Sequence, residues 1–324
     1  MGLTACATEV MPPPAPTPTY TSSWEEPAAT VIAPLNGRVT EAETLAHPSI
    51  AAKVDNHWDA RPQAGLEATD IVFEELVEGG LTRYVAVWHS TIPAEIGPVR
   101  SIRPMDPDIA SPLGGIIAYS GGQPRFIAMM RATPVYNAIH GQADTEATFF
   151  RAPGREGPHD VLVKAPEVVA QHAELPPPPQ QFGYSVDVAS ATATKEGAPT
   201  ARMDFRFGGS ATPAWVWDAA SGTWLRFMTG GAPDLAGTGA QLSAVNVVTL
   251  RVPVTVSQSI PKTELIGAGE AWVSTGGNTV HATWSKATPT SPIRLVDDNG
   301  ATVRLAPGNT WVELVPLSGD AVFS

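Results

Sequence analysis

Hydrophobic and polar positions alternate in short segments along the first half of the chain. Three such segments lie close together, at residues 50–56 (IAAKVDN), 70–77 (DIVFEELV) and 82–90 (TRYVAVWHS). Short segments that are rich in β-branched residues and separated by turn residues such as glycine are typical of β-strands. The pattern therefore predicts three strands in this region.

The pattern changes at residues 114–132 (GGIIAYSGGQPRFIAMMRA). An apolar run, a glycine turn and then hydrophobic residues at helical spacing predict a buried strand followed by an amphipathic helix. Residues 160–172 are expected to form another helix. Because strands and helices are mixed here, we expect a mixed α/β domain over residues 34–182.

A proline-rich stretch at residues 175–181 (LPPPPQQ) predicts a break between two modules. The sequence after it consists of strand-like segments joined by Ser-Gly, Gly-Gly-Asn and Asp-Asn-Gly turns, a pattern typical of β-hairpins. We therefore expect a β-rich, mostly antiparallel domain over residues 200–324. The expected fold class of the whole chain is α+β.

The amino terminus carries a short lipoprotein-like motif. Residues 3–6 (LTAC) resemble a lipobox, the small-residue signal that precedes an acylated cysteine, and Cys6 is the single cysteine of the chain. We expect residues 1–6 to be the remnant of a lipoprotein signal and residues 7–33, rich in proline and threonine, to be an extended tether. A full secretory signal needs an apolar stretch of about 7 to 15 residues, so the coding start is expected further upstream. The alternative is a chance cysteine near the start.

Charge and composition narrow the classes of partner. The net charge of −12 argues against binding to nucleic acid, which requires clustered cationic surface. A single cysteine excludes an intrachain disulfide framework. After the first few residues, no apolar run approaches the roughly 18 residues that cross a bilayer. Nothing in the sequence predicts a cofactor.

Arginine accounts for most of the basic residues and is concentrated in the first domain. A guanidinium group recognises carboxylate or phosphate through a bidentate fork, so this cluster predicts a pocket for an anionic ligand. The candidate ligand-binding residues are Lys53, Arg61, Arg83, Arg100, Ser101, Arg103, Gly121, Gly122, Arg151 and His159. An internal ion-pair network that fixes strand register is the alternative interpretation.

Nearby carboxylates raise the possibility of acid–base catalysis, with Asp55, Asp70 and Glu74 as the candidate catalytic residues. Glu74 and Glu78 on one strand would be about 13 Å apart, beyond the spacing that glycoside hydrolysis uses. Glu74 with Asp55 or Asp70 on a neighbouring strand could meet that spacing.

Two further motifs have competing interpretations. Ser120-Gly121-Gly122 follows an apolar strand, the context of a nucleophile elbow, but it lacks the first glycine of that motif, and we favour a glycine turn that cradles an anion near Arg125. His57 and His159 lie in polar segments without a recognised ligand spacing. We therefore predict no metal site.

The polar segments of both modules resemble those of the YerB-like lipoprotein family. The matching segments are residues 53–56 (KVDN), 60–66 (ARPQAGL), 68–72 (ATDIV), 74, 78–80 (EGG), 82–83 (TR), 97–103 (GPVRSIR), 120–122 (SGG), 150–151 (FR), 158–159 (PH), 217–226, 246–248 (NVV), 267–273 and 283–286 (TWSK). The resemblance covers nearly everything after Asn36. It implies export, lipidation and two domains of unknown function, and it supplies no catalytic residues.

These observations lead to one hypothesis and two alternatives. We expect a binding or accessory lipoprotein on the extracytoplasmic face of the cell membrane, anchored through Cys6, whose first domain holds an anionic small molecule or cell-wall component. One alternative is an envelope enzyme that acts on glycan or phosphate-linked cell-wall material. The other is a scaffold that contacts a protein partner.

Overall fold

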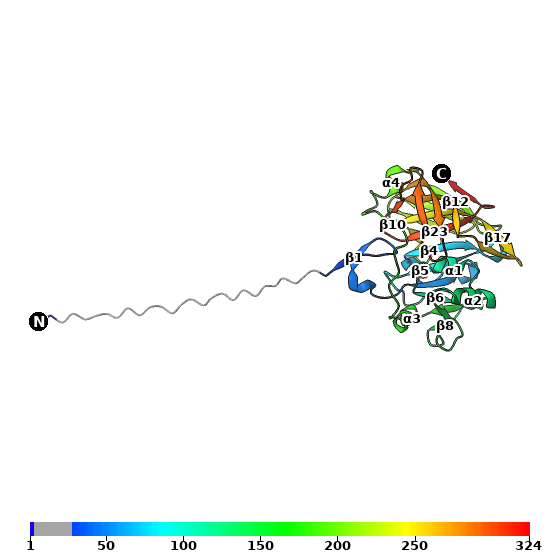
Figure 1. The fold of residues 1–324 in the computed structure, drawn as a ribbon, viewed down its shortest axis with the longest axis horizontal. Helices are drawn as coiled ribbons and strands as arrows, with labels where there is room; N and C mark the ends of the chain where they lie inside the picture. The colour runs from blue at the N-terminus through cyan, green and yellow to red at the C-terminus, as the bar shows by residue number, and fades with distance from the viewer. Residues whose placement is uncertain (3–27) are drawn as a thin grey trace.

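The computed structural model describes residues 1, 2 and 28–324 (Figure 1). Cys6 and most of the predicted tether lie outside the described residues. The last part of that segment is not an extended spacer, because β1 (Thr30–Ile32) pairs antiparallel with β2 (Val39–Glu41). No helix among the described residues has the length and apolar character needed to cross a bilayer.

The fold is mostly β and is built around one large sheet of eleven strands. Strands from the first half of the chain occupy one side of it, in the order β4-β5-β3-β6-β7. These strands are β3 (Ile50–Asp55), β4 (Ile71–Leu76), β5 (Thr82–Trp88), β6 (Ile116–Tyr119) and β7 (Tyr136–Ile139). The three strands expected between residues 50 and 90 are present.

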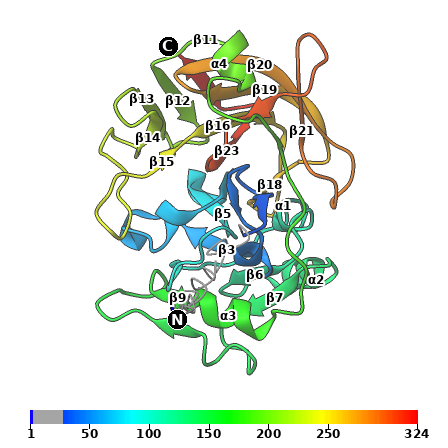
Figure 2. The same cartoon turned by 90° about the vertical axis from the view of Figure 1, so that its left-hand side faces the viewer.

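The second half of the chain continues the same sheet. Its strands in the sheet are β11 (Ala198–Pro199), β16 (Asn246–Val252), β19 (Gly267–Thr275), β20 (Asn278–Lys286), β21 (Arg294–Asp297) and β23 (Thr310–Pro316). β23 lies between β16 and β4 and runs parallel to both. Figure 2 shows this junction, where β23 from the end of the chain meets the blue strands of the first half. The two predicted modules therefore share one sheet, and the second contains a parallel pair that was not expected.

A second, antiparallel sheet belongs to the second half alone. Its order is β15-β14-β13-β12-β24. The strands are β12 (Arg202–Arg206), β13 (Ala214–Asp218), β14 (Thr223–Phe227), β15 (Ser243–Ala244) and β24 (Asp320–Phe323). Three two-stranded pairs complete the β structure: β8 (Phe149–Arg151) with β9 (Val161–Val163), β10 (Gly183–Tyr184) with β22 (Arg304–Leu305), and β17 (Val254–Ser257) with β18 (Ile260–Thr263).

The glycine turns explain two of the three predicted hairpins. Gly276 and Gly277, with φ of 61° and 76°, join β19 to β20 in the left-handed conformation that a tight hairpin turn requires. The Ser-Gly turn likewise joins β13 to β14. The Asp-Asn-Gly turn closes only an isolated bridge between Val296 and Thr302, because β22 pairs with β10 instead.

Helices are few and short. They are α1 (Asp106–Ala110), α2 (Pro124–Arg131), α3 (Ala165–Gln171) and α4 (Thr192–Glu196). The predicted strand, glycine turn and helix of residues 114–132 are present as β6 and α2. The helix expected over residues 160–172 is shorter, because Val161–Val163 pair with β8 before the chain turns into α3. These short helices leave strands dominant in the first domain as well.

Each face of the large sheet is covered by apolar side chains. One face packs with α1 and α2, and the other packs against the five-stranded sheet and α3. Trp215, Trp224 and Trp311 are at most 1% exposed and fill the layer between the two sheets. These tryptophans are therefore core residues.

Candidate functional site

The carboxyl ends of three parallel strands meet at one edge of the large sheet, which we call the carboxyl edge. β3, β6 and β7 run parallel in adjacent positions and end at Asp55, Tyr119 and Ile139. β5 runs antiparallel to β3, and its second residue, Arg83, lies opposite Asp55. In open parallel sheets, ligands bind outside the carboxyl ends of the strands. Most of the predicted ligand-binding residues lie at this edge.

Arg83 is the centre of an arginine cluster at the carboxyl edge. Its guanidinium group donates to the Ser101 carbonyl oxygen (2.9 Å), and Arg103 donates to the same oxygen (3.2 Å). Burial, and then the charges of Arg103 and Arg100, lower the pKa of Arg83 to about 10. Within the described residues, no carboxylate lies within 4 Å of this guanidinium, although Arg83 is only 8% exposed. A nearly buried cation without an ion-pair partner is unusual, because burial of an unpaired charge is unfavourable.

The other two arginines of the cluster have protein partners. Arg103 Nε donates to both carboxylate oxygens of Glu78, at 2.9 and 2.8 Å. Arg100 donates to the Pro158 carbonyl oxygen (2.8 Å), and its Nε lies 3.5 Å from Asp55. Both side chains are therefore held in position by the protein and keep part of their surface exposed.

Lys53 is fully buried beneath the arginine cluster. Its ammonium group donates to Glu75 and to Asp106, the latter at 2.7 Å. Burial lowers the pKa of Lys53 to about 8, although the charge of Asp106 opposes that shift. With no exposed surface, Lys53 supports the site from below and does not reach a ligand in this structure.

Gly121 and Gly122 form the loop between β6 and α2. Their φ angles of 70° and 157° are in the range that favours glycine, and a Cβ at Gly122 would lie 2.9 Å from the Ile102 side chain. The Gly121 carbonyl accepts from the Ile102 N–H, which holds the loop beside the arginine segment. Neither glycine N–H donates to another residue of the described chain. Two free N–H groups beside arginines are suited to an anion.

Ser120 and His140 lie at the ends of β6 and β7. Ser120 Oγ and His140 Nδ1 are 3.1 Å apart, within hydrogen-bond distance. Burial and the charge of Arg151 lower the pKa of His140, which favours the neutral imidazole. Among the described residues, no carboxylate is hydrogen-bonded to His140 to orient its ring. Ser120 and His140 therefore have the geometry of a nucleophile and its general base, but among the described residues the carboxylate that would orient the base is missing.

Asp55 and His159 form a second pair at the carboxyl edge. His159 Nδ1 donates to Asp55 Oδ2 at 2.6 Å, and Asp55 also accepts from the His57 backbone N–H (3.1 Å). Asp55 is only 4% exposed. The buried carboxylate therefore fixes the orientation of His159 and of the chain at His57.

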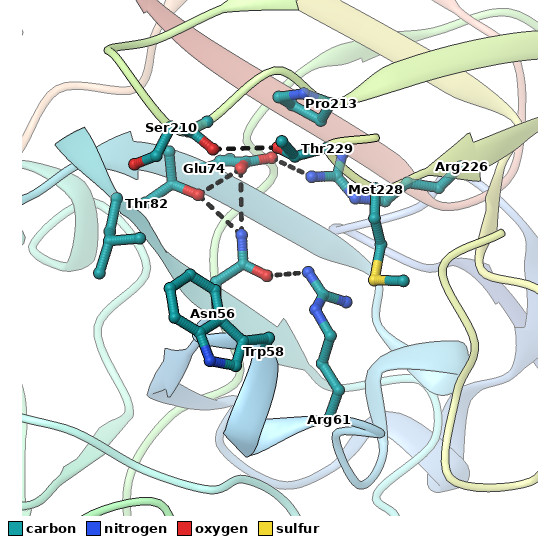
Figure 3. A pocket seen from close by; sticks show the side chains of 12 residues that line it. Asn56, Trp58, Arg61, Glu74, Thr82, Ser210, Pro213, Arg226, Met228 and Thr229 are labelled. Carbon is teal, nitrogen blue, oxygen red and sulfur yellow. Dashed lines mark hydrogen bonds and ion pairs between the residues drawn. The ribbon is translucent and has the colours of Figure 1, made fainter. Parts of the chain in front are cut away.

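A separate pocket of about 350 Å³ lies where the two halves of the chain meet (Figure 3). Asn56, Arg61 and Glu74 contribute from the first half, and Arg226 and Met228 from the second. Arg61 donates to Asn56 and to Asp234. The structure therefore places Arg61 in this pocket and not with Arg83, Arg100 and Arg103.

Arg226 is the buried centre of the charge network beneath that pocket. It is paired with Glu74, with Asp234 (3.1 Å) and with Glu313 (3.0 Å), and its guanidinium carbon lies 4.6 Å from the Trp311 ring centroid. Burial alone would lower the pKa of Arg226, but the charges of these neighbours outweigh it and raise the pKa. The network joins β4, β14 and β23, and so connects the two halves of the chain.

The carboxylates of this network outnumber its cations. Arg61 and Arg226 face three carboxylates, those of Glu74, Asp234 and Glu313. Burial, and then the negative charge of Glu74, raise the pKa of Glu313 well above the usual carboxyl range. A protonated Glu313 would balance the charges, so the network is explained by pairing within the protein and needs no ligand.

The three candidate catalytic carboxylates do not converge. Asp55 is in register with Arg83 and Glu75, whereas Glu74 is in register with Tyr84, so Asp55 and Glu74 point to opposite faces of the sheet. Asp70 accepts hydrogen bonds from Asn36, His89 and Ser90 at the other end of β4 and clamps a loop there. The glycosidase-like pairing of Glu74 with Asp55 or Asp70 is therefore wrong.

Arg151, on β8, forms an ion pair of its own. It pairs with Asp160 at 2.7 Å, and its side chain is 62% exposed.

Sequence reasoning missed Arg226, Asp234 and Glu313. The available signal was the position of Arg226 and Glu313 inside strand-like segments, where charged residues at inward positions must be paired.

The chain matches a known protein family and a solved structure. Residues 35–177 match the family described as "Protein of unknown function (DUF3048) N-terminal domain", and residues 203–312 match its C-terminal domain. The chain is 25% identical over 305 residues to the Bacillus subtilis (strain 168) protein named "Putative lipoprotein YerB", covering 88% of this chain and 86% of that protein. The crystal structure of the YerB protein from Bacillus subtilis superposes with a TM-score of 0.77 at 22% identity, covering 90% of this chain and 99% of that chain. The fold is thus shared with a solved structure.

Proposed function

Because this chain belongs to the DUF3048 family of proteins of unknown function, we propose that it is a cell-envelope lipoprotein, as the name of its relative suggests, and that it binds an anionic ligand. The anchor is Cys6, and the binding domain is the one that contains residues 34–182. The ligand is a small molecule or cell-wall component that carries phosphate or carboxylate. Anchoring places the domain on the extracytoplasmic face of the membrane.

The observation that supports ligand binding is the unpaired guanidinium of Arg83. Arg100 and Arg103 lie beside it, and the free N–H groups of Gly121 and Gly122 lie on the neighbouring loop. A phosphate or carboxylate placed here would satisfy Arg83 with charge-assisted hydrogen bonds, which are about twice as strong as neutral ones. Ser101 fixes the geometry, because its carbonyl oxygen accepts from both Arg83 and Arg103.

A thermal-shift screen tests the ligand site. The full chain is heated with inorganic phosphate, pyrophosphate, nucleotide sugars or dicarboxylates, and at least one class is expected to raise the Tm. A ligand at a hundred times its Kd stabilises by about 2.7 kcal/mol. Arg83→Ala should lose the shift, while Arg206→Ala, which removes an exposed arginine paired with Asp320, should keep it. Equal shifts in the wild type and in Arg83→Ala would contradict the proposal.

Membrane anchoring is tested separately through Cys6. In the gene with its complete export signal, Cys6→Ala should move the protein from the membrane fraction to the soluble extracytoplasmic fraction, because each buried methylene of an acyl chain contributes about 0.8 kcal/mol to anchoring. Fractionation followed by immunoblotting measures the distribution. Retention of the Cys6→Ala variant in membranes would show that another element holds it there.

The hydrogen-bond distance between Ser120 and His140 favours a hydrolytic enzyme as the second candidate function. Gly121 and Gly122 would supply N–H groups to a developing oxyanion, and neutral His140 would accept the serine proton. The substrate would then be an ester or phosphate-linked component of the cell wall. Turnover of such material would support the hydrolytic enzyme, and binding without turnover would support the binding lipoprotein.

A further inference from the structure

Three potential metal ligands come together where two distant loops meet. His57 directly precedes the short helix at Trp58–Ala60, and His159 lies two residues before β9, which begins at Val161. One ligand atom from each of His57, Asp59 and His159 lies within 4.8 Å of the other two. The two imidazole rings are stacked, with centroids 4.6 Å apart and planes inclined by 14°.

Asp55 orients this group from behind. Its buried carboxylate accepts the Nδ1–H of His159 at 2.6 Å, so Nε2, on the far side of that ring, is directed away from Asp55. The same carboxylate accepts the backbone N–H of His57 (3.1 Å). In metal sites, a histidine ligand usually donates the N–H of one ring nitrogen to a carboxylate and binds the metal through the other nitrogen.

We propose that His57, Asp59 and His159 bind one divalent transition-metal ion of the zinc class, with Nε2 of His159 as a ligand. Imidazole and carboxylate are common zinc ligands, and hard ions such as Mg²⁺ prefer oxygen alone. Ligand atoms of a tetrahedral zinc ion are about 3.4 Å apart, so the three side chains need to close by roughly 1 Å. Asp59 already lies 3.3 Å from His57 Nδ1, so the adjustment needed is a rotation of one of the two nearly parallel imidazole rings toward the ion, and His57, whose side chain is 20% exposed, can make it.

The surroundings of the cluster suit a reactive or ligand-binding ion more than a structural one. Three protein ligands leave one position of a tetrahedral ion open, as in catalytic zinc sites. Asp59 and His159 line a cavity of about 670 Å³, whose wall also contains Arg61 and Arg155. An anionic group in this cavity could contact the ion and these guanidinium groups together.

This metal site goes beyond the proposed function and rests on different residues. The anion site depends on Arg83, whereas the metal site depends on His57 and His159. The two sites adjoin through Arg100, whose Nε lies 3.5 Å from the Asp55 carboxylate and which donates to the carbonyl of Pro158, the residue before His159. Arg83→Ala should abolish anion binding and leave metal binding intact, so failure of either proposal is visible independently of the other.

Isothermal titration of the metal-free full chain with Zn²⁺ tests the site. Every sample carries Cys6→Ser, so that the thiol does not bind zinc. We expect one equivalent of Zn²⁺ to bind, with at least tenfold weaker binding in His57→Ala and in His159→Ala. Asp55→Asn should weaken binding by about 10- to 100-fold, the usual cost of losing an outer-shell carboxylate.

His281→Ala is the matched control. His281 is a second imidazole held between carboxylates, at 2.6 Å from Asp298 and 3.4 Å from Glu270, and its loss should leave the affinity unchanged. Circular dichroism checks that each variant is folded, and if His159→Ala unfolds, His57→Ala decides alone. Absence of Zn²⁺ binding in the wild type, or the same affinity in the His57→Ala variant, would overturn the proposal.

Discussion

Replacing Arg226 by alanine is expected to destabilise the protein by about 3–5 kcal/mol, the usual cost of removing one partner from a buried charge network. The substitution would remove the cation that Glu74, Asp234 and Glu313 share, and Arg61 would remain as a partner of Asp234 alone. These side chains are 0% exposed, so solvent cannot replace the guanidinium. Urea denaturation at pH 7, followed by tryptophan fluorescence, measures the difference.

The control for Arg226 is an arginine with a similar ion pair at the surface. Arg206 pairs with Asp320, both about half exposed, and Arg206→Ala should cost no more than about 1 kcal/mol. The deficit of Arg226→Ala should also shrink as the pH falls from 7 to 5. Burial and the charge of Glu74 raise the native pKa of Glu313, and Arg226 opposes that rise; without the arginine the pKa rises further, so protonation of Glu313 at low pH restores stability. Similar losses in both variants would show that Arg226 is not a key stabilising residue.

The individual strands could be predicted from the sequence because their signal is local. The segments at residues 50–56, 70–77 and 82–90 contain β3, β4 and β5, and the Gly276-Gly277 turn joins a hairpin as predicted. The position of β23 between β16 and β4 could not be predicted in this way. Its pairing places Glu313 opposite Glu74, and no short-range pattern specifies partners so far apart in the sequence.

The same distinction between local and distant contacts applies to the candidate site. Arg83, Arg100 and Arg103 are near in sequence, and Arg83 and Arg103 both donate to the Ser101 carbonyl, so their common location is a local feature of the chain. Arg61 is equally near but belongs to another network, because its partner Asp234 is 173 residues away. Residue type and sequence distance were therefore insufficient to assign Arg61 to the correct pocket.

The histidines show why spacing rules miss some metal sites. His159 and Asp55 are 104 residues apart, and neither flanking sequence contains a known ligand spacing. Only the fold, in which the loop before β9 returns to the end of β3, brings His159 beside His57. The sequence-based prediction that no metal binds this chain rested on ligand spacing, and the geometry now motivates the zinc titration.

Lys53→Met is the second substitution with a large expected effect. It should destabilise the protein by about 3–5 kcal/mol, because Glu75 and Asp106 would remain buried without their ammonium partner. Since the cluster of Arg83, Arg100 and Arg103 lies above this lysine, the same variant should also lose any anion-dependent rise in Tm. Urea denaturation at pH 7 measures the stability, and Lys195→Met, which removes an exposed lysine on α4, is the control and should change it by less than about 0.5 kcal/mol.

The pH dependence of this difference tests whether Lys53 itself is responsible. Burial lowers its native pKa to about 8 from an ordinary value of 10.5. Between these two values the unfolded chain binds a proton that the native chain has released, so wild-type stability gains a contribution as the pH rises through this window. Lys53→Met has no such group, and the difference between wild type and variant should therefore widen from pH 7 to pH 9. A difference that stays constant or narrows would show that the native pKa of Lys53 is not lowered.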